Sequence, residues 1–399
     1  MRRLAAGLLC AAILTAATGA EASSPPTFIG ALRLYTTFAA GLANAFSAST
    51  VKVDPGVYHE CVEVKDLVLL NIVGKKGVVI DATGCDVGLT ITSGEGITIK
   101  GLTIVGAKTG ISVKPGVERV LVTKTTVSDP ATDPQSATLE TGVLVQSAND
   151  VTLSAVTIRG AKREAVKVAS AAGAIVKKST LADGAGAGVV VDLGTSATVA
   201  KNTITNLGSF GVVFSHLGGG GAADSLIASN KIFALPGGIQ VAGPRNVIEK
   251  NKLTDVSGVA ILAGGTAQAS STYRKNTIVG AGDAAIVAPG VGDVFEKNTI
   301  KEPIAEGIDV IGEDNVFTGN KVTAAGTTGV LVEATASGNV FDGTSSSKAA
   351  GDGFRVDGAG NGFTKAKASG SGGLDLNDAA GAATTNVYTD CKFKTSNAP

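Results

Sequence analysis

Short runs in which apolar and polar residues alternate recur along the chain from residue 88 onward. Each repeat contains an alternating strand, then Asn in many copies, a second strand of the form Thr/Lys-Ile/Val, a Gly-rich turn, and a third strand beginning Gly-Ile or Gly-Val. Because side chains alternate between the faces of a strand, one face of each strand is apolar and the other polar. The pattern predicts three short strands per repeat, and it is clearest in residues 196–214, 224–241, 291–310 and 315–332.

The recurring Asn indicates how the repeats stack. Three short strands cannot bury an apolar face alone, so each strand must pair in parallel with its equivalent in the next coil. The chain is therefore predicted to be all-β, with about thirteen coils forming three parallel sheets around an apolar column. We expect the Asn side chains to lie inside, where amide hydrogen bonds run from coil to coil. They are Asn202, Asn230, Asn251, Asn276, Asn298 and Asn320, spaced by 28, 21, 25, 22 and 22 residues.

The composition agrees with a turn-rich folded chain and excludes several classes of protein. The 399 residues include 54 Gly, and Trp is absent. Lys plus Arg and Asp plus Glu number 34 each, a balance that argues against a nucleic-acid-binding or polybasic membrane-surface protein. After the first 22 residues no stretch approaches 18 apolar residues, so we expect no membrane span in the mature chain.

Residues 1–22 have the features of a signal peptide. Arg2 and Arg3 precede an apolar stretch over 4–17, and Ala20 and Ala22 supply the small residues of a cleavage site. The sequence therefore predicts an exported protein, either periplasmic or extracellular.

The segment 51–60, VKVDPGVYHE, is followed by Val68-Leu-Leu and Gly77-Val-Val-Ile-Asp81. It resembles the first coil of many exported right-handed parallel β-helix proteins with pectin-lyase-like folds, and the resemblance extends over about residues 50 to 390. It implies one domain, a single-stranded right-handed parallel β-helix over 51–399.

An amphipathic stripe precedes this coil. Its apolar residues follow one another at spacings of three or four, which is typical of a helix. In the family such a helix commonly seals the N-terminal end, where an open coil would expose core and unpaired strand edges. We therefore predict a capping helix within residues 23–50. The stripe comprises Phe28, Leu32, Tyr35, Phe38, Leu42 and Phe46.

Three cysteines follow the predicted leader: Cys61, Cys85 and Cys391. Export to an oxidising compartment favours a disulfide. The 24-residue separation of Cys61 and Cys85 fits neighbouring coils of the implied β-helix, so we predict that these two pair. Cys391 then remains a free, buried thiol near the C-terminus.

One candidate site surrounds a long insertion at 128–140. Asp129 and Asp133 lie in it, while Arg163 and Lys167 belong to the next coil. A Ca²⁺-dependent lyase acting on a polyuronate needs such a set, because the metal neutralises the uronate and a base removes the neighbouring proton. Two Asp-Pro turns account for the aspartates as turn formers, which is the interpretation we favour. We therefore expect no metal or other cofactor, with Ca²⁺ only under the lyase alternative.

A second candidate lies on the outward face of the last Gly-Ile-x-Val strands, the sheet that carries the cleft in catalytic members of the family. Alternation points a set of charged side chains to solvent, where they could bind a ligand, and paired carboxylates there could serve in glycoside hydrolysis. An outward charged ladder also keeps a sheet soluble, and we favour that interpretation. The residues are Asp309, Glu333, Arg355, Asp357 and Asp375.

These observations favour a non-catalytic, exported β-helix protein that binds a polysaccharide or a cell-envelope partner. Sugar-binding clefts stack rings on Trp or Tyr, and this chain has no Trp and four Tyr. The alternative is a Ca²⁺-dependent polysaccharide lyase or a glycoside hydrolase acting on acidic polysaccharide.

Overall fold

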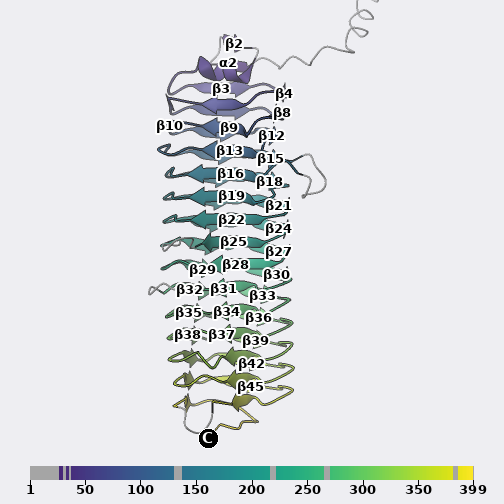
Figure 1. The fold of residues 1–399 in the computed structure, drawn as a ribbon, viewed down its shortest axis with the longest axis vertical. Coiled ribbons are helices and arrows are strands. Elements are labelled where there is room, and N and C mark those ends of the chain that lie inside the picture. The colour runs from purple at the N-terminus through teal and green to yellow at the C-terminus, as the bar shows by residue number, and fades with distance from the viewer. Residues whose placement is uncertain are drawn as a thin grey trace, which may run out of the picture.

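The computed structural model describes residues 27–29, 33–35, 37–129, 137–215, 222–264, 270–380 and 385–398. They form a parallel β-helix of about 14 turns, in which the chain passes repeatedly through three sheets in the order A, B, C (Figure 1). The predicted all-β stack of parallel coils is confirmed. The three turns of each coil are named here A–B, B–C and C–A after the sheets they join.

Sheet A contains the first strand of each coil, paired in parallel. Its strands are β3 (Thr50–Val53), β7 (Asn71–Gly74), β11 (Thr98–Lys100), β14 (Leu121–Thr123), β17 (Thr152–Ser154), β20 (Ile175–Lys177), β23 (Thr198–Ala200), β26 (Leu226–Ala228), β29 (Val247–Glu249), β32 (Thr272–Arg274), β35 (Val294–Glu296), β38 (Val316–Thr318), β41 (Val340–Asp342), β44 (Gly362–Thr364) and β47 (Val387–Thr389).

Sheet B contains the second strand of each coil. Its strands are β4 (Gly56–Tyr58), β8 (Val78–Asp81), β12 (Thr103–Val105), β15 (Thr126–Ser128), β18 (Thr157–Arg159), β21 (Thr180–Gly184), β24 (Thr203–Leu207), β27 (Lys231–Leu235), β30 (Lys252–Val256), β33 (Thr277–Val279), β36 (Thr299–Lys301), β39 (Lys321–Thr323), β42 (Ser345–Ser347) and β45 (Lys367–Ser369).

Sheet C contains the Gly-Ile-x-Val strands, which lie across the front of Figure 1. They are β5 (Val62–Val64), β9 (Val87–Ile91), β13 (Thr109–Val113), β16 (Thr141–Gln146), β19 (Glu164–Ala169), β22 (Ala187–Asp192), β25 (Phe210–Ser215), β28 (Gly237–Val241), β31 (Ile261–Ala263), β34 (Ile286–Ala288), β37 (Ile308–Val310), β40 (Val330–Val332), β43 (Phe354–Val356) and β46 (Leu376–Asp378). Between sheets C and A, β6 (Leu67–Val68) pairs in parallel with β10 (Gly94–Glu95).

The N-terminal end differs from the predicted capping helix over 23–50. Only α2 (Phe38–Ala43) is helical, while β1 (Thr27–Ile29) pairs antiparallel with β2 (Arg33–Tyr35) and with β3. The prediction failed because β3 is the edge of sheet A, and a strand laid along it satisfies backbone groups that a helix cannot reach. The second half of the stripe keeps its role in part: Phe38 and Leu42 are buried, whereas Phe46 is 68% exposed.

The Asn side chains form the predicted internal ladder at the A–B turns. All six are buried. The Asn276 amide Nδ2 donates to the Ile248 carbonyl at 2.9 Å and to Asn298 Oδ1 at 3.0 Å. In turn, Asn276 Oδ1 accepts from the main-chain N of Asn251 at 3.0 Å and from its Nδ2 at 3.1 Å. Each amide therefore pairs polar groups of the coils on both sides of it.

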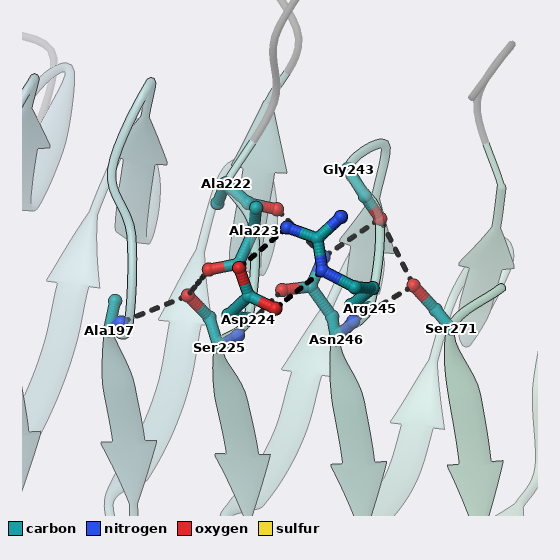
Figure 2. A network of polar contacts seen from close by, with 9 residues as sticks. All are labelled: Ala197, Ala222, Ala223, Asp224, Ser225, Gly243, Arg245, Asn246 and Ser271. Carbon is teal, nitrogen blue, oxygen red and sulfur yellow. Dashed lines mark hydrogen bonds and ion pairs between the residues drawn. The ribbon is translucent and has the colours of Figure 1, made fainter. Parts of the chain in front are cut away.

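A second ladder, not predicted, follows the C–A turns. Ala197 N donates to Ser225 Oγ, Ser225 N to Asn246 Oδ1, and Asn246 N to Ser271 Oγ (Figure 2). Its signal in the sequence is an Asn directly before a sheet A strand, and the Ser and Asp members interrupt that signal. The ladder continues through Asp293, Asn315, Asn339, Asn361 and Asn386.

Aromatic rings fill the centre of sheet A in the later coils. Tyr273, Phe295, Phe317, Phe341 and Phe363 stack face to face at centroid spacings of 4.7 to 4.8 Å. Their interplanar angles are 10° or less. The equivalent inward positions of the earlier coils are aliphatic. Most of the few aromatic residues are therefore in the core, where they cannot stack on a ligand.

Cys61 and Cys85 form the predicted disulfide, with 5.8 Å between their Cα atoms. Cys391 is a free, partly buried cysteine. In the described part of the chain, no helix has the length and apolar character needed to span a bilayer.

Candidate functional site

The outer face of sheet C presents one central side chain from each strand. Parallel pairing without a shift of register brings these side chains into a single column. The column is mostly apolar, with few polar or charged members. From the sixth coil onward it consists of Lys167, Val190, Val213, Gln240, Leu262, Val287, Asp309, Leu331, Arg355 and Asn377.

Asp309 is the carboxylate of this column. It stands on β37 between Val287 of β34 and Leu331 of β40. Its Oδ1 is buried and has no hydrogen-bond partner among the described residues. Burial raises the pKa of Asp309 to about 6, and the charges of Glu333 and Glu306 add to the shift. The carboxyl group is therefore poised to gain or lose a proton near neutral pH.

Three further carboxylates surround Asp309: Glu333, Glu306 and Asp283. Glu333 follows β40, and Glu306 precedes β37, where its Oε1 accepts a hydrogen bond of 2.8 Å from Thr327 Oγ1. Asp283 is exposed in the preceding coil. Of the three, the sequence prediction included only Glu333. Glu306 and Asp283 lie in turns, and only the stacking of coils brings them to Asp309.

Arg355 and Asp357 form an ion pair with each other on the same face. The Arg355 Nε lies 3.1 Å from both carboxylate oxygens of Asp357, and this contact raises the pKa of the guanidinium. Both residues lie two coils beyond Asp309. The structure thus places four of the predicted ligand-binding residues on one face: Asp309, Glu333, Arg355 and Asp357.

Asp375 does not point to solvent as expected, since it is only 3% exposed. It lies at the register of Gly353 in the turn before β46, so Asn377 takes the outward position instead. Its Oδ2 accepts from Lys394 N at 3.0 Å, and its own N donates to Thr395 Oγ1. The inward–outward alternation holds within a strand but not in the preceding turn, so Asp375 anchors the C-terminal segment.

The first candidate cluster is engaged in local contacts. Asp129 Oδ2 accepts hydrogen bonds from Thr138 N, Thr138 Oγ1 and Leu139 N, which closes the base of the insertion. Lys167 Nζ lies 3.3 Å from Glu164 Oε1, and the other oxygen of Glu164 accepts from Thr141 Oγ1.

Arg163 is exposed in the turn before β19. Asp133 lies outside the described residues. Within the described ranges, no three His, Cys, Asp or Glu side chains are arranged to hold a metal ion. The expected Ca²⁺ site, which would include Asp133, therefore stays a prediction.

Solved structures with similar folds are enzymes and a phage protein. A GH87 α-1,3-glucanase catalytic unit from Streptomyces thermodiastaticus matches 96% of this chain and 69% of its own, at 13% identity and a TM-score of 0.54. DFA-IIIase from Arthrobacter chlorophenolicus in complex with GF2 matches 73% and 83%, at 14% and 0.51. The tailspike protein of E. coli bacteriophage HK620 in complex with a pentasaccharide matches 80% and 71%, at 9% and 0.54. At these identities the likeness concerns the fold alone. No curated protein matches the sequence.

The stacked parallel coils, with charged groups on the outer face of one sheet, define a parallel β-helix protein. The family model described as a right handed beta helix region matches residues 87–253 and 257–398. The chain therefore belongs to the right-handed β-helix family.

Proposed function

We propose that the protein binds a polysaccharide along the outer face of sheet C, with Asp309 at the centre of the site. The observation that carries the proposal is the buried Asp309 Oδ1, which has no hydrogen-bond donor among the described residues. Desolvating an acceptor without a partner is costly. A sugar hydroxyl is a suitable donor, since it reaches a shallow carboxylate and carries no charge that the acidic surroundings would repel.

The rest of the column supports a carbohydrate ligand. Leu331, Val287 and Leu262 form an apolar strip beside Asp309, against which the C–H faces of sugar rings can pack. Arg355, Glu333 and Gln240 add polar groups along the same line. The similar folds seen in complex with GF2 and with a pentasaccharide add support from related architecture.

We further propose that the protein is exported and meets this ligand in the periplasm or outside the cell. The predicted leader over 1–22 motivates this, and the Cys61–Cys85 disulfide supports it because such bonds persist in oxidising compartments. Fusion of residues 1–22 to a reporter enzyme tests the leader, and retention of the reporter in the cytoplasm would contradict it.

The binding test compares Asp309→Asn with Glu313→Gln, an exposed carboxylate in the C–A turn of the same coil. Soluble α-1,3-glucan oligosaccharides and the HK620 pentasaccharide are suitable probes for calorimetry. We expect Asp309→Asn to weaken binding about 10-fold, or about 1.4 kcal/mol, and Glu313→Gln to leave it unchanged. Equal affinities for the two variants would exclude Asp309 from the site.

Glycoside hydrolysis is a second candidate, favoured by the raised pKa of Asp309 beside other carboxylates. A protonated Asp309 can give its proton to the glycosidic oxygen, while Glu306 or Glu333 takes a proton from the attacking water. Binding through the ionised carboxylate strengthens as the pH rises through about 6, whereas proton donation fails over the same range. Reducing-end release measured from pH 4 to 8 therefore separates the two candidates.

The lyase alternative makes a different product. Polygalacturonate incubated with and without Ca²⁺ would then gain the absorbance of an unsaturated sugar, and Lys167→Ala or Arg163→Ala would abolish it. Since Lys167 is held by Glu164, we expect no such product. Turnover lost in either variant would establish the lyase instead.

A further inference from the structure

The A–B turns carry a column of lysines in an unusual backbone conformation. The residue after each sheet A strand has a positive φ, and its main-chain N donates to the next coil. A left-handed backbone is easiest for Gly and strained for a residue with a Cβ. Lys is the commonest residue here, with φ of 49° to 58°, so the turn geometry does not explain its recurrence. The lysines are Lys124, Lys178, Lys201, Lys250, Lys275, Lys297 and Lys365.

A second column of lysines runs beside the first. Each begins a sheet B strand, and the register places Lys231 directly against Lys252, and Lys367 against Lys392. Like charges directly opposite each other destabilise a sheet. Lys321 occupies the same column. Packing and pairing therefore do not account for these lysines either.

We call the two columns together the lysine ridge. It is exposed along its length. Among the ion pairs of the described residues, only Lys250 of the ridge takes part, with Glu249 at 3.2 Å. Glu249 is also bound by Arg274 at 2.8 Å. The ridge comprises Lys178, Lys201, Lys231, Lys250, Lys252, Lys275, Lys297, Lys321, Lys365 and Lys367.

The ridge ends in a hollow at the C-terminal coil. This hollow has a volume of about 470 Å³, and Lys367 of the ridge lines it together with Lys392 and Lys394. Phe393 provides an apolar wall. Three ammonium groups around one hollow favour an anionic group of a ligand.

Charge is thus segregated on a chain whose 34 basic and 34 acidic residues balance. The carboxylates around Asp309 lie on the outer face of sheet C, while the ridge follows the corner between sheets A and B. A polyanion is repelled by the first surface and attracted by the second. The ridge is therefore a binding surface separate from the carbohydrate site proposed above.

We propose that the lysine ridge binds an acidic polysaccharide as an extended chain, with a terminal acidic sugar in the hollow. Lys178 and Lys365 are eight coils apart, so the ridge is straight over about 40 Å, with one or two positive charges every 4.8 Å or so. An extended polyuronate presents carboxylates along such a line. Duplex DNA winds away from it, single-stranded nucleic acid needs aromatic platforms, and membrane-surface binding adds an apolar face. The described part of the ridge has no such row of aromatic or apolar side chains.

The test uses polygalacturonate as the probe and the full chain. Lys201→Gln, Lys275→Gln and Lys297→Gln are combined, because Gln keeps the side-chain length and the backbone strain. The control combines Lys52→Gln, Lys65→Gln and Lys76→Gln, three exposed lysines of the first coils that belong to no ion pair among the described residues. Thermal melting establishes that both proteins are folded.

We expect the ridge variant to bind polygalacturonate at least 10-fold more weakly than the control, and its slope of log affinity against log salt to fall by about 2. Equal affinity of the two variants would overturn the proposal. Tighter binding of single-stranded DNA or of anionic vesicles than of polygalacturonate would overturn the assignment to a polysaccharide. Asp309→Asn should leave polygalacturonate binding intact, so the two proposed surfaces can fail independently.

Discussion

The coils before and after Asn202 build the same three sheets with different interiors. In the earlier coils, apolar side chains such as Leu102, Val120 and Val151 occupy the positions beside sheet A, and the sheet C strands reach six residues. In the later coils, Asn ladders flank sheet A on both sides, aromatic rings fill its centre, and from β31 onward the sheet C strands have three residues.

The difference shows two ways of holding a coil in register. Long sheet C strands supply main-chain hydrogen bonds in the early half. Where these strands shorten, side-chain amides and stacked rings take over, and both repeat at the coil spacing. The acidic group around Asp309 lies in the half held by side chains.

Removing a ring from the stack is expected to have the largest effect. Phe317→Ala should destabilise by about 3–5 kcal/mol, since it opens a cavity and breaks two stacked contacts. Leu153→Ala at the equivalent early position loses a smaller side chain and no stacking. Denaturant titration of both variants measures the difference, and equal losses would mean that the stack adds nothing beyond buried area.

Breaking the amide ladder should come next. Asn276→Leu removes the partners of Ile248 O and of the main-chain and side-chain N–H groups of Asn251, which should cost about 2–4 kcal/mol. Thr125→Val is the control at the equivalent early turn, where the hydroxyl makes one hydrogen bond within its own turn. If both variants melt like the wild type, the ladder does not stabilise the later coils.

The smallest effect concerns Asp293, where the second ladder contains a carboxyl group. Burial raises the pKa of Asp293 to about 6, and its Oδ2 has no partner among the described residues. Because the folded pKa lies above the unfolded value, near 4, the protonated form is favoured by folding. Its contribution is fully present below pH 4 and is lost as the pH rises through about 6.

Asp293→Asn should therefore stabilise the protein by about 1–3 kcal/mol at pH 7.5, and change little at pH 4. The new amide can donate to a carbonyl of the preceding coil, as Asn315 Nδ2 does to Gly290 O at 2.9 Å. Melting curves at the two pH values test this, and a gain that is independent of pH would rule out the proton linkage.

The sequence-based errors arose at turns and ends. Asp375 was placed outward by extending strand alternation into the preceding turn, and the helix over 23–50 was predicted without considering the edge of sheet A. Asp309 and Glu333 were found because they lie on or next to strands of clear alternation. Glu306 and Asp283 were missed because their neighbours come from other coils.

By itself, the sequence determined the repeating strands, their inward and outward faces, the parallel stacking and the first Asn ladder, since all of these follow from local alternation and a recurring period. Only the tertiary structure decided which side chains meet across coils. Insertions vary the coil length between 21 and 28 residues, so neighbours cannot be counted along the chain. A balanced net charge is a sum without positions, and stacking separated it into an acidic group around Asp309 and the lysine ridge.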